Sequence, residues 1–265
     1  MLIGIPKEIK VHEYRVGVPP AGVRELVQNG HQVMVQHDAA EEIGMHNEDY
    51  ERAGAEIVET PEEIFERAEM VVKVKEPQAH ECAMLREGQV LFTYLHLAPD
   101  PAQTTALVES GCVAIAYETV TDSHGGLPLL APMSEVAGRM SIQAGAHCLE
   151  KVNGGSGMLI GGVPGVEPAK VVIIGGGVVG SHAAHIAVGM GANVCIVDRS
   201  TDVLKALWRQ FGNALNTVYS TRGALEEHVL DADLVVGGVL IPGAAAPKLV
   251  TADIIKRMKP GSVIV

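Results

Sequence analysis

The chain has 265 residues, of which 47% are hydrophobic and only 3% are aromatic, and its formal net charge at pH 7 is −12. Such an acidic chain lacks the basic surface that nucleic-acid binding requires, so we expect no nucleic-acid partner. The length is sufficient for a full hydrophobic core and favours two domains.

Short apolar strands alternate with amphipathic helices along the first half of the chain. We expect strands at Leu2–Ile5, Gln32–Gln36, Met70–Val74, Val90–Leu95 and Cys112–Ala116, and helices at Ala21–Gln28, Asn47–Ala53, Pro61–Ala68 and Pro101–Ser110. This alternation predicts a parallel sheet that is covered on both faces.

A loop rich in glycine and proline, Thr119–Pro132, separates this part from the rest of the chain. We therefore predict domains at residues 1–130 and 131–265, the second including a connecting helix from 134 to 151 whose N-cap is Ser134. After it we expect strands at Val171–Ile174, Val194–Val197, Asn216–Ser220, Leu234–Val239 and Ser262–Val265, with helices between them. The predicted fold is α/β: two doubly wound parallel-sheet (Rossmann-like) domains with a cleft between them.

The stretch from Val171 to Asp198 predicts a dinucleotide site. An apolar strand leads into Gly175-Gly176-Gly177-Val178-Val179-Gly180, a G-x-G-x-x-G match that opens a helix. The glycines at 175, 177 and 180 permit a tight turn, an approach to a pyrophosphate and close helix–strand packing. The helix N-terminus, with Val178 and Val179, offers free N–H groups to the phosphates. An ordinary βαβ unit with a glycine-rich turn is the alternative interpretation.

The acidic residue that ends the next strand favours NAD as the cofactor. Asp198 lies at the position from which a carboxylate binds the ribose hydroxyls, where it would repel the 2′-phosphate of NADP. Arg199, its neighbour, weakens this preference without reversing it.

Four charged or titratable residues follow strands of the first predicted domain: Arg15, Lys75, His96 and Glu118. Parallel α/β sheets bind ligands beyond the carboxyl ends of their strands, so these residues are candidates for chemistry. Each also has a structural interpretation. Arg15 could form a surface ion pair, Lys75 could be a solvated strand end, and His96 could donate to a backbone carbonyl.

Other kinds of catalytic or membrane site find little support in the sequence. His182 and His185 lie three residues apart on the predicted nucleotide-site helix, but no further ligand has suitable spacing, so we expect no metal. The four cysteines show no C-x-x-C spacing and are interpreted as reduced core residues. The most apolar window, Leu234 to Pro247, is too short and too interrupted to span a bilayer, and no N-terminal signal is seen. A cytoplasmic enzyme is the expectation.

Seven blocks of sequence together resemble the L-alanine dehydrogenase family. They are GIPKEIKVHEYRVGVPPAGVREL, VKVKEP, LFTYLHLA, AIAYETV, LPLLAPMSEVAGR, GGVPGVEP and GGGVVG. The resemblance implies NAD-dependent, reversible oxidative deamination of L-alanine to pyruvate and ammonium by a homo-oligomer, commonly a hexamer.

The same resemblance implies roles for individual residues. Arg15 and Lys75 would bind the substrate carboxylate, and His96 would be the general acid/base. Further residues would bind the cofactor: Ser134 at the phosphates, Asp198 at the adenosine ribose, and Ser220, Val239 and Leu240 along the adenine and nicotinamide path.

The resemblance also implies a segment beyond Val265, with a catalytic aspartate and further nicotinamide contacts. Because the chain stops within an apolar strand, we expect a fragment that lacks full activity. Two alternatives to the alanine dehydrogenase interpretation remain open. One is the NAD-binding subunit of proton-translocating transhydrogenase, which works in a membrane complex. The other is a non-catalytic NAD-binding protein.

Overall fold

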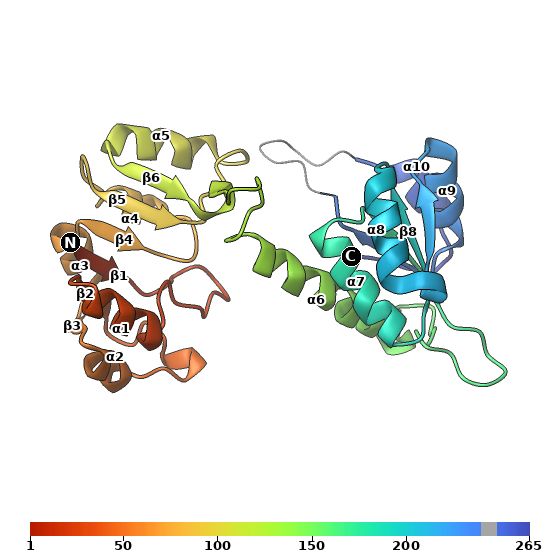
Figure 1. The fold of residues 1–265 in the computed structure, drawn as a ribbon, viewed down its shortest axis with the longest axis horizontal. Coiled ribbons are helices and arrows are strands. Elements are labelled where there is room, and N and C mark those ends of the chain that lie inside the picture. The colour runs from red at the N-terminus through yellow and green to blue at the C-terminus, as the bar shows by residue number, and fades with distance from the viewer. Residues whose placement is uncertain (240–247) are drawn as a thin grey trace. The chain divides into compact units, whose positions relative to one another are not determined.

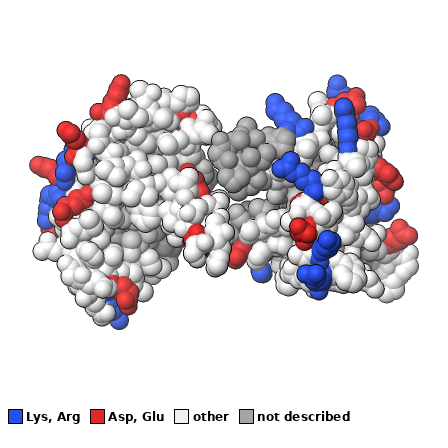
Figure 2. Space-filling model, turned by 45° about the horizontal axis from the view of Figure 1, so that its top comes forward, with Lys and Arg blue, Asp and Glu red and all other residues white. Residues whose placement is uncertain are grey.

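The computed structural model describes residues 1–239 and 248–265 and divides into two compact units, residues 1–129 and 130–265. Each unit is a parallel sheet with helices packed on it (Figure 1). On the face shown in Figure 2, acidic and basic side chains are interspersed over the second unit, whereas most of the first unit is uncharged and its charged side chains lie near its margin. Among the described residues, no helix has the length and apolar character needed to cross a membrane.

The first unit contains a six-stranded parallel sheet in the order β3-β2-β1-β4-β5-β6. Its strands are β1 (Leu2–Ile5), β2 (Gln32–Gln36), β3 (Glu56–Val58), β4 (Met70–Val72), β5 (Val90–Thr93) and β6 (Val113–Ala116). Its α-helices are α1 (Pro20–Gln28), α2 (Asn47–Ala53), α3 (Pro61–Arg67), α4 (Ala79–Cys82) and α5 (Pro101–Ser110). The chain reverses its direction across the sheet between β1 and β4, which makes this the switch point at which such sheets bind ligands.

Helices cover both faces of this sheet. Val23 and Tyr50, from α1 and α2, pack with Ile5 and Val35 on one face. The other face has a separate core, to which α3, α4 and α5 contribute side chains. Two of these helices have side-chain N-caps: the Thr60 hydroxyl accepts from Glu63 N, and the Asp100 carboxylate accepts from Gln103 N.

The second unit contains a five-stranded parallel sheet in the order β11-β10-β7-β8-β9. Its strands are β7 (Lys170–Ile174), β8 (Asn193–Asp198), β9 (Asn216–Tyr219), β10 (Leu234–Gly237) and β11 (Val263–Ile264). Its α-helices are α6 (Ala131–Leu149), α7 (Val178–Gly189), α8 (Thr201–Phe211), α9 (Arg222–Asp231) and α10 (Ala252–Arg257). The switch point here lies between β7 and β10, so the glycine turn after β7 occupies it.

Several boundaries differ from the sequence prediction. Helix α6 begins at Ala131, so Ser134 lies inside its first turns and is not an N-cap; the prediction was wrong. Pro132 explains the error, because a proline is tolerated in the first turn of a helix, where its missing N–H has no intrahelical partner. Strand β3 and the short helix α4 were not predicted. The Cys148 thiol lies in an exposed residue and not in the core.

Candidate functional site

Three of the predicted site residues follow neighbouring strands at the carboxyl edge of the first sheet, at its switch point and beside it. Arg15 lies in the loop after β1, Lys75 three residues after the end of β4, and His96 three residues after the end of β5. Parallel pairing of β4 with β5, with Val72 opposite Phe92, brings the segments of Lys75 and His96 side by side. The Tyr94 backbone N–H continues this pairing by donating to Val74 O at 3.3 Å.

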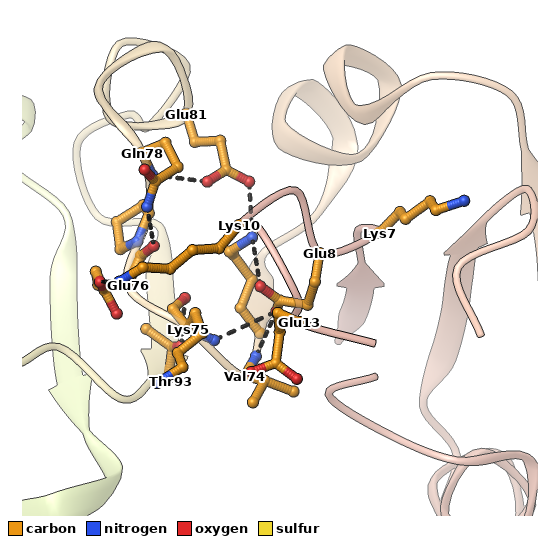
Figure 3. Close-up of polar contacts among 12 residues, drawn as sticks. Lys7, Glu8, Lys10, Glu13, Val74, Lys75, Glu76, Gln78, Glu81 and Thr93 are labelled. Carbon is orange, nitrogen blue, oxygen red and sulfur yellow. Dashed lines mark hydrogen bonds and ion pairs between the residues drawn. The ribbon is translucent and has the colours of Figure 1, made fainter. Parts of the chain in front are cut away.

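The backbone around Lys75 is fixed by buried side chains. The Glu8 carboxylate accepts from Val74 N at 2.6 Å and from Lys75 N at 3.4 Å. The Thr93 hydroxyl donates to Lys75 O at 2.9 Å (Figure 3). The Val74 N–H donates to the Glu8 side chain and not to a neighbouring strand. Strand β4 therefore ends at Val72 and does not extend to Val74 as predicted.

Arg15 forms a bidentate ion pair with Glu13. Its Nε and terminal guanidinium nitrogen donate to the two Glu13 carboxylate oxygens at 2.7 Å and 2.5 Å. Partial burial acts to raise the pKa of Glu13, but the hydrogen bonds and charge of Arg15, together with the charge of Lys75, hold it below its usual range. Glu13 is therefore ionised, and it joins the two cations in one charged group.

His96 has an unusual backbone conformation that a second carboxylate stabilises. Its φ angle is +49°, in the left-handed region that a β-carbon disfavours. Glu118, which follows β6, accepts from His96 N at 2.7 Å and from Leu95 N at 3.1 Å. The His96 residue is exposed, and its ring lies roughly parallel to that of Tyr94, with the ring centroids 6.2 Å apart. Glu118 thus fixes the backbone that presents the imidazole.

Glu76, next to Lys75, carries an unpaired buried oxygen. Its Oε1 accepts a hydrogen bond from Lys10, whereas its Oε2 is buried without a hydrogen-bond partner among the described residues. Although burial acts to raise the pKa of Glu76, the contact with Lys10 and the charge of His96 lower it. An ionised carboxylate therefore lies close to the candidate acid/base.

The sequence analysis did not anticipate a buried charged cluster formed by Glu8, Lys73 and Glu81. Lys73 is fully buried, and its Nζ donates to Glu81 at 2.7 Å. A lysine within the apolar run from Val71 to Val74 was the signal that could have revealed it, because buried lysines require ionic partners.

The glycine turn of the second unit has the geometry that a pyrophosphate requires. Gly175 has φ +97°, and a Cβ on Gly180 would lie 1.8 Å from Gly175 O, so the first turn of α7 lies directly against the turn. By contrast, apart from Gly177 and its two chain neighbours, no atom of the described residues lies within 4 Å of a Cβ built on Gly177. Within the described residues, no side chain caps α7, whose N-terminal N–H groups begin at Val178 and Val179. The turn therefore has both open space and donors for a phosphate group.

Asp198 stabilises this turn from the end of β8. Its two carboxylate oxygens accept from Gly176 N and from Ser200 N, each at 2.7 Å. Its backbone carbonyl accepts from Ser220 N at 2.9 Å. Asp198 and Ser220 are therefore adjacent, next to the glycine turn.

The remaining predicted cofactor residues can be placed with one exception. A Cβ on Gly175 would lie 2.9 Å from Val239 Cγ2, so Val239 borders the turn. Ser134 lies in α6 one turn before Gly138, which packs against Val179 of α7. Leu240 lies outside the described residues.

The two histidines of α7 have structural partners. Arg139 Nε donates to His182 Nδ1 at 3.2 Å, and His185 packs edge-on against the Phe211 ring. Among the described residues, no group of three or more potential ligands could hold a metal ion.

Two family models match the chain. "Alanine dehydrogenase/PNT, N-terminal domain" matches residues 4–137, and "Alanine dehydrogenase/PNT, C-terminal domain" matches residues 141–265. A curated alanine dehydrogenase of Halomonas elongata is 56% identical over all 265 residues, which span 71% of that relative.

Solved structures show the same relationship. An L-alanine dehydrogenase structure superposes with a TM-score of 0.93 at 50% identity, covering 100% of this chain and 73% of the other. The transhydrogenase of Sinorhizobium meliloti superposes with a TM-score of 0.82 at 26% identity, covering 100% of this chain and 77% of the other.

Proposed function

The chain belongs to the alanine dehydrogenase/PNT family, and from this membership we propose that it catalyses the NAD-dependent oxidative deamination of L-alanine to pyruvate and ammonium. The reaction is reversible. One structural observation supports the proposal most directly: Arg15, Lys75 and His96 follow three neighbouring strands, β1, β4 and β5, at the carboxyl edge of one sheet. Two cations and one imidazole at this place suit a small acid that exchanges a proton during reaction.

Arg15 and Lys75 bind the substrate carboxylate in this proposal. The guanidinium of Arg15 is oriented by Glu13, and the backbone of Lys75 is fixed by Glu8 and Thr93. A carboxylate held at two points leaves the alanine Cα–H a single orientation, which supplies much of the entropic part of catalysis.

NAD, if bound, would supply the acceptor for the hydride of the alanine Cα. In the proposed reaction the alanine ammonium first releases a proton to solvent, so that loss of the hydride leaves an iminium. Water attacks the iminium carbon while His96 accepts a proton from that water, and His96 returns this proton to the nitrogen. As ammonia leaves, the carbinol hydroxyl gives its proton to His96 and becomes the pyruvate carbonyl. Glu118 holds the His96 backbone, and the anionic Glu76 is suited to stabilise the imidazolium that forms.

The residues of the second unit fit a dinucleotide. Open space above Gly177 and the uncapped start of α7 accommodate the pyrophosphate. We assign the ribose hydroxyls to Asp198, which contacts the glycine turn and whose charge favours NAD over NADP. We assign cofactor roles also to Ser134, Gly175, Gly180, Val178, Val179, Ser220, Val239 and Leu240. The domain functions follow: residues 1–130 bind substrate and residues 131–265 bind NAD.

Transhydrogenase is the weaker alternative. The relatives named alanine dehydrogenase share 51–56% of their residues with this chain, whereas the transhydrogenase structure shares 26%. A homohexamer and a cytoplasmic location are further proposals, which rest on the family resemblance.

Formation of NADH from NAD on addition of L-alanine tests the proposal. The protein expressed from its whole reading frame is expected to show it, and Lys75→Met is expected to raise the KM for pyruvate by about a hundredfold. Lys7→Met is the matched control, because the Lys7 side chain points away from Lys75 (Figure 3). NAD binding without alanine-dependent turnover would instead favour a non-catalytic protein, and hydride transfer between nucleotides without alanine would favour a transhydrogenase.

A further inference from the structure

Three ionisable side chains that take no part in the proposed reaction are buried together next to Lys75. The side chains of Glu8, Lys73 and Glu81 are 1%, 0% and 3% exposed. Lys73 Nζ lies 2.7 Å from a Glu81 oxygen and 3.5 Å from a Glu8 oxygen. Burying such ions is unfavourable unless pairing compensates, so hydrophobic packing alone does not account for the cluster.

Each carboxylate of the cluster uses one oxygen for Lys73 and the other for backbone. Glu8 Oε1 accepts from Val74 N at 2.6 Å and from Lys75 N at 3.4 Å. Glu81 Oε2 accepts from Gln78 N at 2.7 Å, which caps helix α4. The ion pairs with Lys73 therefore hold the two carboxylates against the segments that precede and follow Glu76.

The backbone N–H and the backbone carbonyl of Lys75 both form hydrogen bonds with side chains. Its N–H donates to Glu8, and its carbonyl accepts from the Thr93 hydroxyl at 2.9 Å. The Glu8 side chain and Thr93 are buried, so neither contact is open to competition from water. A lysine side chain has a long flexible stem, and fixing its backbone reduces the volume that its ammonium group explores.

We propose that Glu8 is a positioning residue for Lys75, with Lys73 as its buried counter-ion. Glu8 sets the backbone from which the Lys75 ammonium reaches the substrate carboxylate. Thr93 fixes the opposite side of the same residue. This inference rests on the proposed function, because it takes from it that Lys75 binds the carboxylate.

The test compares Glu8→Leu with Glu81→Leu in the protein expressed from its whole reading frame. Both variants remove a buried carboxylate from Lys73, but only Glu8 contacts the backbone of Lys75. The readout is the rate at which trinitrobenzenesulfonate modifies Lys75, followed by peptide mass spectrometry at increasing pyruvate with NADH present. The KM for pyruvate, kcat and the Kd for NADH are measured in parallel.

Wild type and Glu81→Leu are expected to be protected at similar pyruvate concentrations. In Glu8→Leu, the concentration for half-protection and the KM for pyruvate rise about tenfold, while the Kd for NADH is unchanged. Equal protection in wild type and Glu8→Leu would overturn the positioning role, as would an equal loss in Glu81→Leu. Absence of protection in wild type would instead overturn the role of Lys75 on which the proposed function depends.

Thr93→Val is a second variant that tests the proposal if Glu8→Leu does not fold. This near-isosteric change removes the hydrogen bond to Lys75 O and leaves the charged cluster intact. It is expected to raise the half-protecting pyruvate concentration severalfold, and an unchanged value would overturn the proposal.

Discussion

An added methyl group is expected to have different effects at two glycines of the same turn. A Cβ on Gly177 meets no described atom within 4 Å, whereas a Cβ on Gly180 would lie 1.8 Å from the backbone oxygen of Gly175. Gly177→Ala is therefore expected to impair nucleotide binding without unfolding the protein. Gly180→Ala is expected to destabilise the fold itself.

The magnitudes follow from the local geometry. Gly177 is the N-cap of α7 with φ −70°, so alanine is sterically allowed. Alanine lowers the conformational entropy of the unfolded chain, which stabilises the folded protein by about 0.4–1 kcal/mol. Alanine is also a poorer N-cap, which costs about 0.5 kcal/mol, so the net change in the free energy of unfolding is close to zero. At Gly180 the backbone must move, which costs about 3 kcal/mol. A methyl group in the space for the pyrophosphate weakens binding by at least about 1.4 kcal/mol, which is tenfold in Kd.

Fluorescence titration with NADH and thermal unfolding separate these effects. Gly177→Ala should show a Kd raised at least about tenfold and a Tm within about 2 °C of wild type. Gly180→Ala should lose about 10 °C in Tm. Wild-type affinity in Gly177→Ala would refute the placement of the pyrophosphate at this turn.

Three further predictions concern the carboxylates. Asp198→Asn should raise the Kd for NADH about tenfold and narrow the preference over NADPH, because the charge that repels the 2′-phosphate is lost; an unchanged ratio of the two Kd values would contradict this. Glu118→Leu should lower kcat about a hundredfold at unchanged NADH affinity, because the His96 backbone loses the acceptor of its N–H. A wild-type kcat would show that the hydrogen bond from His96 N to Glu118 is dispensable. Glu13→Gln should lower the free energy of unfolding at pH 7. Because the pKa of Glu13 is lowered in the folded state, this difference from wild type should persist above about pH 4.3 and disappear as pH falls through the folded pKa. Denaturant unfolding at pH 7 and pH 3 measures it, and a constant difference would count against the Glu13–Arg15 pair.

The sequence predicted what depends on local patterns. The strand, glycine turn and helix that follow Lys170 were identified because apolar periodicity and the glycine spacing are contained within about 30 residues. Placement of Lys75 and His96 at one sheet edge followed from the rule that ligands bind beyond the carboxyl ends of parallel strands. The strand and the helix were confirmed with only small shifts at their ends.

Partners that lie far apart in the chain could not be predicted in this way. Glu8 contacts Val74 across 66 positions, and Glu118 reaches His96 across 22. Neither spacing corresponds to a helix or strand period, so a single sequence contains no signal that pairs them. The left-handed conformation of His96 is likewise a product of its tertiary contact with Glu118, since local propensity disfavours it.

Two glycines allow helix α6 to pack closely against the rest of its unit. A Cβ on Gly138 would lie 2.2 Å from Val179 O in α7, and one on Gly145 would lie 2.6 Å from the Leu234 side chain in β10. Helix backbones in such close contact cannot slide past one another without repacking. A bulkier residue at 138 is therefore expected to displace the first turn of α7 together with the glycine turn before it, and so to lower nucleotide affinity from a position outside that turn.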